Sequence, residues 1–440
     1  MKRESTFPSR SPAGYLDLVG GNADFRHLWY GQIVSLFGDW FNLIASAALV
    51  STLTRSGFAV GGLFVVRMLA PFLVSPIAGV AADRYNRKWL LIAADLSRAV
   101  VVLGFLFVRS PQMAWLLYAL TAVQLAISGF FFPARNAILP DIVTRSELGA
   151  ANALSSATWS VMLAVGAALG GLVSGEVGIY PAFVIDSLTF LLSAFFISRV
   201  QHDHVPDLQE GGRSIRAGFR QYVDGLRYLR QQLDILAISL HKAAAALTVS
   251  GAFQVVQVII AERYFVIGQG GGTSLGLLYA VAGVGTGIGP IIVRRFTGDE
   301  NQRLRTMLVW SYAASMVGML ISAPLINFPV VLFGTLLRSF GTGINWVFST
   351  QLLLQLVPDR VRGRVFSTEF AFFTLANAVG AASGGWILDN TALGVSDLMV
   401  WMAFSSLVPG ALWLVWLLAG EKAEREEFEE FGHELHEFEK

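Results

Sequence analysis

The chain has 440 residues, of which 54% are hydrophobic and only 14% are charged, and its formal net charge is +1. Soluble domains carry about 25% charged residues, so this composition excludes an ordinary soluble protein and indicates a polytopic membrane protein. The lack of cysteine excludes disulfides and thiolate chemistry, and the six histidines show no metal-ligand spacing. We therefore expect no metal and no other cofactor. Nucleotide-binding and hydrolase motifs are also missing, so we expect neither an enzyme nor a nucleic-acid partner.

A helix needs about 20 apolar residues to cross the hydrocarbon core, so apolar runs of that length predict spanning helices. Twelve such runs follow one another along the chain, at 28–53, 58–82, 89–109, 112–135, 147–174, 180–199, 233–261, 274–294, 305–326, 328–356, 364–387 and 397–419. Lys and Arg crowd the alternate connections, which places both termini in the cytoplasm. The predicted fold is an all-α membrane protein with twelve transmembrane helices.

The order of these runs predicts two six-helix halves. "ILPDIVTRSEL" at 138–148 is similar to "QLVPDRVRGRV" at 355–365, and "GAALGG" is similar to "GAASGG" later in the chain. The two pairs are separated by nearly the same number of residues. Such an offset indicates an internal duplication with pseudo-symmetric halves. The predicted segments are a cytoplasmic tail at 1–27, a bundle at 28–199, a cytoplasmic linker with an amphipathic helix at 200–232, a bundle at 233–419 and an acidic cytoplasmic tail at 420–440.

The stretch "GVAADRYNRK" at 79–88 gathers charge between the second and third helices. Gly79 lets another helix approach closely, and Asp83 can then accept hydrogen bonds from a helix N-terminus or an arginine. We interpret this stretch as a cytoplasmic gate, although its cations also fit a role in topology and in binding lipid headgroups. Glu369, near the inner end of the eleventh helix, is assigned to the same gate. The gate candidates are Gly79, Asp83, Arg84, Arg87, Lys88 and Glu369.

The pattern G-x-x-x-D-R-x-x-R-K resembles motif A of the major facilitator superfamily. "FRHLWYGQIVSLFGDW", "DLSRA", "FFPARNAILPDIV" and "AANALSS" resemble the branch that contains macrolide-efflux proteins and the enterobactin exporter. The resemblance implies a transporter with alternating access, and the branch implies drug:proton antiport. One feature departs from this pattern. The antiporter motif G-P-x-x-G-G reads "GAALGG" here, with Ala167 at the proline position, which weakens the inference of export.

Charges within the spans are costly in hydrocarbon unless they are paired or face water. Asp39 lies about eleven residues into the first helix, near the midplane, and Arg67 lies at similar depth in the second. They form either a structural ion pair or a site where Asp39 is a protonatable carboxylate for which proton and substrate compete. Asp95 and Arg98, one helical turn apart, predict a structural salt bridge.

Polar side chains at comparable depth predict the lining of a substrate cavity. They are Arg67, Gln124, Lys242, Gln254, Gln257, Arg338, Asn345 and Asn377. Lys242 and Arg338 make the second half cationic, which suits a carboxylate, phosphate or catecholate at least as well as a cationic drug. Small residues on equivalent helices predict close helix packing or sliding, namely Gly166, Gly170, Gly171, Gly380, Gly384 and Gly385.

The sequence thus favours a proton-coupled exporter of bulky amphipathic compounds such as a drug, macrolide or siderophore. We expect a monomer in the cell inner membrane, with protons, lipids and the substrate as its partners. A lipid or lysolipid flippase and an inward facilitator are alternatives with the same fold. A receptor or scaffold that does not transport is an alternative of another class.

Overall fold

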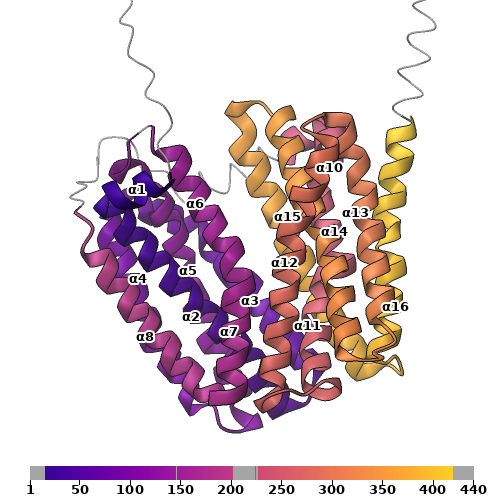
Figure 1. Ribbon diagram of the computed structural model, residues 1–440, viewed down its shortest axis with the longest axis horizontal. Coiled ribbons are helices and arrows are strands. Elements are labelled where there is room, and N and C mark those ends of the chain that lie inside the picture. The colour runs from indigo at the N-terminus through magenta and orange to yellow at the C-terminus, as the bar shows by residue number, and fades with distance from the viewer. Residues whose placement is uncertain (1–14, 145, 202–222, 224–225, 420–440) are drawn as a thin grey trace, which may run out of the picture. The chain divides into compact units, whose positions relative to one another are not determined.

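A computed structural model of the chain describes residues 15–144, 146–201, 223 and 226–419 (Figure 1). The regular elements within these ranges are all helices, and twelve helical segments are long and apolar enough to cross a membrane. The all-α class and the count of twelve spans are therefore confirmed. The expected tail at 420–440 lies outside the described residues, as does most of the amphipathic helix expected within 200–232.

The first six spans follow a short helix, α1 (Tyr15–Gly21). They are α2 (Ala23–Thr54), α3 (Gly57–Arg84), α4 (Arg87–Leu103), α5 (Ala114–Ile142), a fifth span that combines α6 (Leu148–Val161) with α7 (Ala167–Leu172), and α8 (Ile179–Ser198). Two π-helical segments, Met162–Gly166 and Val173–Val177, complete the fifth span. A π-helical turn inside a spanning helix is rare and often occurs at functional sites.

The other six spans begin with α10 (Leu233–Ala245) and α11 (Gly251–Ile259), which share one span with the π-helical segments Ala246–Ser250 and Ile260–Tyr264. They continue with α12 (Gly272–Thr297), α13 (Asn301–Ser322), α14 (Phe328–Leu356), α15 (Asp359–Asn390) and α16 (Val395–Ser405), after which helical turns run to residue 419.

Two predicted boundaries differ from the structure for physical reasons. α5 runs on to Ile142, although the prediction ended it at 135, because Arg135 is buried and donates to Ser155 Oγ at 2.5 Å rather than facing water. The predicted tail at 1–27 contains helix α1, whose Leu18 is fully buried in a cluster with Phe25. Part of the supposed tail therefore belongs to the folded bundle.

Polar residues at the turns explain where several helices start. The side chains of four residues accept a hydrogen bond from the backbone N–H three positions on: Asn22 (2.9 Å), Ser56 (3.0 Å), Asn86 (3.3 Å) and Asn327 (2.9 Å). Each of these hydrogen bonds satisfies one of the backbone N–H groups that a first helical turn leaves unpaired. Such a cap typically stabilises the helix by about 1 kcal/mol. Short polar turns can therefore end one span and start the next.

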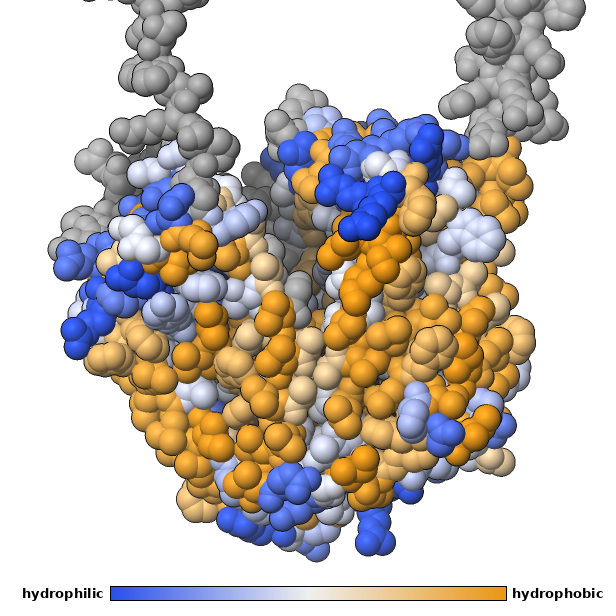
Figure 2. All heavy atoms as spheres, viewed as in Figure 1, coloured by the Kyte–Doolittle hydropathy of each residue, from blue (hydrophilic) through white to orange (hydrophobic). Residues whose placement is uncertain are grey.

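The chain forms two compact units. The first contains Met1–Arg220 and Gln257–Ala280, and the second contains Gln221–Val256 and Val281–Lys440. The end of the seventh span and the start of α12 therefore belong to the first unit. The predicted division at 200–232 placed both segments in the second half. In each unit, apolar side chains cover the middle of the helices and hydrophilic ones gather towards their ends (Figure 2). This distribution matches a hydrocarbon core between two polar interfaces.

Close helix crossings in the second unit depend on glycine. A Cβ on Gly318 of α13 would lie 2.3 Å from Arg338 N and 2.5 Å from Gly334 O of α14. A Cβ on Gly341 would likewise lie 2.3 Å from Ser311 O. These backbones therefore touch directly, which is how helices associate in lipid without a hydrophobic driving force. The predicted glycine clusters did not include these three positions.

The predicted glycines also lie at helix contacts. Gly170 lies against Phe41 of α2, and Gly384 lies against Ala252 of α11. Their neighbours repeat this relation, with Gly166 against Trp40 and Gly380 against Gly251, whereas Gly171 meets Gly276 of α12 and Gly385 is buried. Equivalent helices thus pack in the same way in both halves, which supports an internal duplication.

We predict that Gly318→Ala lowers the free energy of unfolding by about 1–3 kcal/mol, because its methyl group has no space against α14. Gly287→Ala on α12 is the matched control, since a Cβ there meets nothing within 4 Å. The control is expected to keep or raise stability, because alanine favours a helix by up to about 1 kcal/mol over glycine. Thermal unfolding in detergent, followed by tryptophan fluorescence, measures both. Equal melting temperatures for the two variants would contradict the crossing.

Candidate functional site

Charged side chains of the first unit meet between α2, α4 and α8. Asp95 on α4 is fully buried and accepts hydrogen bonds from the Arg98 guanidinium and from Ser193 Oγ of α8, the latter at 2.6 Å. Arg98 Cζ lies 4.2 Å from the centre of the Phe190 ring and 4.9 Å from that of Phe131. Two aromatic faces and a carboxylate thus fix the guanidinium inside the bundle.

Arg98 also reaches Asp39 on α2, with 3.8 Å between Nη1 and Oδ1. The Asp39 side chain is 28% exposed, whereas that of Arg98 is 1% exposed. Arg67 lies near enough for its charge to act on Asp39, but no ion pair within 4.0 Å joins them in the described part of the chain. The interpretation as an Asp39–Arg67 ion pair is therefore corrected, because Arg98 provides the contact. Asp39 is therefore the partly exposed member of an otherwise buried cluster of charged side chains.

Asp186 on α8 is a further member of this cluster that the sequence analysis missed. Its exposed fraction is 0%, and neither of its carboxylate oxygens has a hydrogen-bond partner among the described residues. Asp39, Arg98 and Arg67 all act on it electrostatically. The signal was present in the sequence, because "AFVIDSLTF" places one acid inside an apolar run of spanning length.

In the second unit, Lys242 on α10 lies opposite Glu369 on α15, with 2.9 Å between Nζ and Oε1. Both side chains are buried. Lys242 Nζ also donates to Thr350 Oγ1 at 2.7 Å and lies 4.5 Å from the centre of the Trp346 ring. Glu369 was assigned to a cytoplasmic gate and Lys242 to a substrate cavity, yet the structure joins them in one pair.

Other predicted cavity residues of the second unit also lie in buried polar contacts. Gln254 Nε2 donates to Asn377 Oδ1 at 2.8 Å, which joins α11 to α15. Arg338 Cζ lies 3.9 Å from the centre of the Phe253 ring, and Asn345 is buried on the same helix as Arg338. Cations, amides and aromatic rings therefore alternate inside this unit.

Three buried polar residues lie apart from these contacts. Gln124 on α5 and Gln257 on α11 are buried, and within the described chain neither bonds to another predicted cavity residue. Gln257 groups with the first unit. His241 Nδ1 lies 3.0 Å from Tyr312 Oη, and Trp413 packs edge-on against its ring, so this histidine is part of the packing of α10.

The 79–88 stretch spans the end of α3 and the start of α4. The surroundings of Gly79 and the side chains of Asp83 and Arg84 are not among the described parts of the chain, so their gate assignment stays a prediction. Arg87 Nη1 lies 2.6 Å from Asp141 Oδ2 and donates to Ala137 O at 3.1 Å. The following Lys88 is half-buried. Arg87 therefore fastens this turn to the end of α5 within the same unit.

The equivalent turn of the second unit is fastened by an acid. Asp299 accepts hydrogen bonds from Arg294 Nη2 at 2.9 Å and from Gln351 Nε2 of α14 at 2.7 Å. These hydrogen bonds, that from Arg294 foremost, hold the pKa of the Asp299 carboxyl below its usual range. Val293 stands where Asp83 stands in the first copy, and the acid of this turn lies six residues further on. Here an acid in the turn accepts from a neutral amide, where the first copy has an arginine paired with an acid, but the turn is again tied to the fourth helix of its half.

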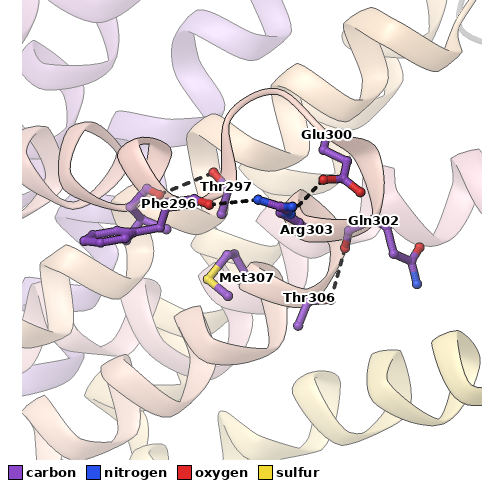
Figure 3. Close-up of a pocket in the computed structure, with 8 residues that line it drawn as sticks. Phe296, Thr297, Glu300, Gln302, Arg303, Thr306 and Met307 are labelled. Atoms are coloured by element: carbon purple, nitrogen blue, oxygen red, sulfur yellow. Dashed lines mark hydrogen bonds and ion pairs between the residues drawn. The ribbon is translucent and has the colours of Figure 1, made fainter.

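A pocket lies beside this turn, between the end of α12 and the start of α13 (Figure 3). Arg303 pairs with Glu300 at the start of α13 at 2.6 Å, and it also donates to Phe296 O of α12 at 3.3 Å (Figure 3). Because its main charges neutralise each other, the pocket offers a ligand little fixed charge. It contains none of the predicted cavity residues, so the buried charges are the better candidates for function.

Comparison with known proteins identifies the family. Residues 28–304 match the model of the Major Facilitator Superfamily. The chain is 26% identical to the "Putative bacilysin exporter BacE" of Bacillus amyloliquefaciens, covering 88% of this chain and 93% of that protein. It is also 26% identical to the "Uncharacterized MFS-type transporter YfiS" of Bacillus subtilis (strain 168), covering 84% and 87% of the two chains.

Solved structures with the same fold include the nucleoside transporter NupG, with a TM-score of 0.67 and 12% identity over 89% of this chain and 98% of that one. The human organic anion transporter MFSD10 (TETRAN) aligns with a TM-score of 0.62 and 16% identity over 89% and 99%. These likenesses concern the fold alone.

The relatives and the family are transporters and not enzymes. Twelve spans and bacterial exporter relatives indicate a multi-pass protein of the cell inner membrane. The chain belongs to the major facilitator superfamily of membrane transporters.

Proposed function

We propose that this transporter exports a bulky amphipathic compound by alternating access and that inward-moving protons drive the export. Asp39 carries the proposal. It is a partly exposed carboxylate in the middle of a spanning helix, and its nearest cation, Arg98, lies 3.8 Å away. Such a group can be neutralised either by a proton or by a cationic part of the substrate.

Coupling follows from this competition. A conformation in which Asp39 is protonated and one in which it is ionised differ in charge inside the membrane, so proton binding biases the equilibrium between them. Protonation from the outer side and release to the inner side would then return the emptied transporter for another cycle. The direction of export is supported by the relatives that are named exporters. The branch resembling macrolide-efflux proteins and the enterobactin exporter stays a prediction.

The proposed substrate class follows from the second unit. Lys242 lies over Trp346 and Arg338 over Phe253, while Gln254 and Asn377 supply neutral amides. Aromatic faces favour an apolar ring system, and the cations and amides favour a polar or anionic group on the same molecule. An amphipathic compound combines both.

The proposal includes an orientation with both termini in the cytoplasm. The turns with Arg87 and with Arg294 and Arg295 would then lie on the inner side, in agreement with the positive-inside rule. It also includes a monomer as the transporting form, with Gly79, Asp83, Arg84 and Lys88 acting at the cytoplasmic gate.

We predict that Asp39→Asn abolishes proton-driven export, because an amide keeps the shape of the carboxyl but cannot release a proton. Full-length protein in proteoliposomes is tested with ethidium, a macrolide, bacilysin and a catecholate siderophore, with and without an inward proton gradient. The wild-type chain is expected to move at least one of these faster with the gradient, and Asp39→Asn to lose that increase.

Glu300→Gln is the matched control, because this acid is 57% exposed in a turn. It is expected to transport like the wild-type chain. Gradient-driven transport that survives Asp39→Asn would contradict the role of Asp39. Equal transport with and without a gradient in the wild-type chain would instead indicate a facilitator.

We predict that Lys242→Met and Glu369→Gln each destabilise the protein by about 3–5 kcal/mol, because each leaves a buried charge without its partner. The double variant is expected to regain most of this loss, since it contains neither charge. Its transport is expected to stay impaired if the pair contributes to the substrate site. Thermal unfolding and proteoliposome transport measure the two effects.

The exposed pair of Arg303 and Glu300 supplies the control for burial. Glu300→Gln is expected to change stability by less than about 1 kcal/mol, because the two side chains are 60% and 57% exposed. A double variant of Lys242 and Glu369 that is as unstable as the single variants would show that the ion pair is not the source of the loss.

A further inference from the structure

Asp186 is a buried carboxylate for which the cycle described above has no role. Its neighbours donate elsewhere: Ser187 Oγ donates to Ala99 O at 2.9 Å, and Thr189 Oγ1 donates to the backbone carbonyl of Asp186 at 2.7 Å. Both carboxylate oxygens are left without a hydrogen bond in the described chain. An ionised carboxylate in this state is strongly unfavourable in hydrocarbon.

The carboxyl group of Asp186 points at the turn of α2 that carries Asp39. A Cβ on Gly38 would lie 2.0 Å from Thr189 Oγ1 and 2.3 Å from Asp186 Oδ1, so the hydroxyl and the carboxyl together occupy the space that the missing side chain leaves. The side-chain amide of Asn42, one turn along α2, faces the carboxyl group as a potential hydrogen-bond donor, although the geometry is too poor for a hydrogen bond and Asn42 Nδ2 has no other partner in the described chain. Asp186 is therefore buried directly beside the partly exposed Asp39.

The charges around Asp186 do not balance. The groups that act on it are Asp39 from α2, Arg67 from α3 and Arg98 from α4, and Arg98 also contacts Asp95. Tyr279 of α12 acts on Arg67, and Glu176, which precedes α8, accepts a hydrogen bond from Thr273 at 3.3 Å. Three carboxyl groups thus share two guanidinium groups, which leaves one negative charge in excess when all three are ionised.

We propose that Asp186 is the binding site of the transported proton, that one proton occupies it per cycle, and that Asp39 exchanges this proton with water. Of the three carboxyl groups, those of Asp95 and Asp39 contact Arg98, whereas that of Asp186 has no ion pair in the described chain. The inference rests on the proton coupling proposed above.

The proton balance is simple. On loading, a proton from water adds to a carboxylate oxygen of Asp186 and makes the cluster neutral, which favours a conformation closed to water. On release, the same proton returns to water on the other side, and the cluster regains its negative charge, which favours an open conformation. The 28% exposure of Asp39 gives water access to the edge of the cluster.

The test is infrared spectroscopy of the full-length protein in lipid during a pH titration, with the band of protonated carboxylic acid as the readout. Asp186→Asn is expected to remove one such band, and Glu300→Gln is expected to keep it. Asp39→Asn leaves two carboxyl groups for two guanidinium groups, so its band is expected to persist only to a lower pH than in the wild-type chain. Asp186→Glu is expected to keep the band at a shifted frequency, and it decides the matter if Asp186→Asn does not fold. A full band in Asp186→Asn, or an unshifted band in Asp186→Glu, would overturn the assignment.

The same variants in proteoliposomes separate this inference from the proposed function. We expect gradient-driven ethidium export by the wild-type chain and its fall to the level without a gradient in Asp186→Asn. If transport by the wild-type chain is the same with and without the gradient while Asp186→Asn loses the band, proton coupling fails, and Asp186 is a protonated carboxyl group that carries no transported proton. If Asp186→Asn keeps both gradient-driven transport and the band, the site fails and the coupling stands. A band that appears only without Na⁺ assigns the site to that cation and overturns the proton assignment.

Discussion

The first unit depends on the burial of one guanidinium, that of Arg98. A charge inside hydrocarbon is tolerated only with partners, and Arg98 takes them from α2, α4 and α8 together: Asp39, Asp95 and the ring of Phe190. The same residue thereby fixes three helices and sets the electrostatic field in which the remaining acids titrate. Structure and proposed proton coupling depend on one side chain.

The two units balance their buried charges differently. The first holds several acids around shared arginines, whereas the second pairs Lys242 with Glu369 and surrounds its cations with aromatic rings. A cluster with excess negative charge suits a small cation such as a proton, and a polar and aromatic lining suits a larger organic molecule. In the proposed cycle the first half of the duplicated fold therefore binds the driving proton, and the second half binds the transported substrate.

Local sequence features predicted the spans, because span length and hydropathy are set by the membrane itself. Asp95 and Arg98 could be placed together because a helix brings residues three apart onto one face. Lys242 and Glu369 meet only through the packing of α10 against α15, which no spacing along the chain reveals, so Glu369 was assigned by depth alone. Asp186 was visible as an acid in an apolar run, but its lack of an ion pair within the described chain could be seen only in the structure.

Gly318, Gly334 and Gly341 lie where two backbones touch, so these positions tolerate substitution far less than most others in the second unit. Where two backbones touch, no larger side chain fits, whereas a lipid-facing position needs only to be apolar. Most of the sequence is then free to drift while a few small residues keep the helix crossings in place. A fold with this division can be shared at 26% identity with a bacterial relative and at 12% with NupG, as it is here.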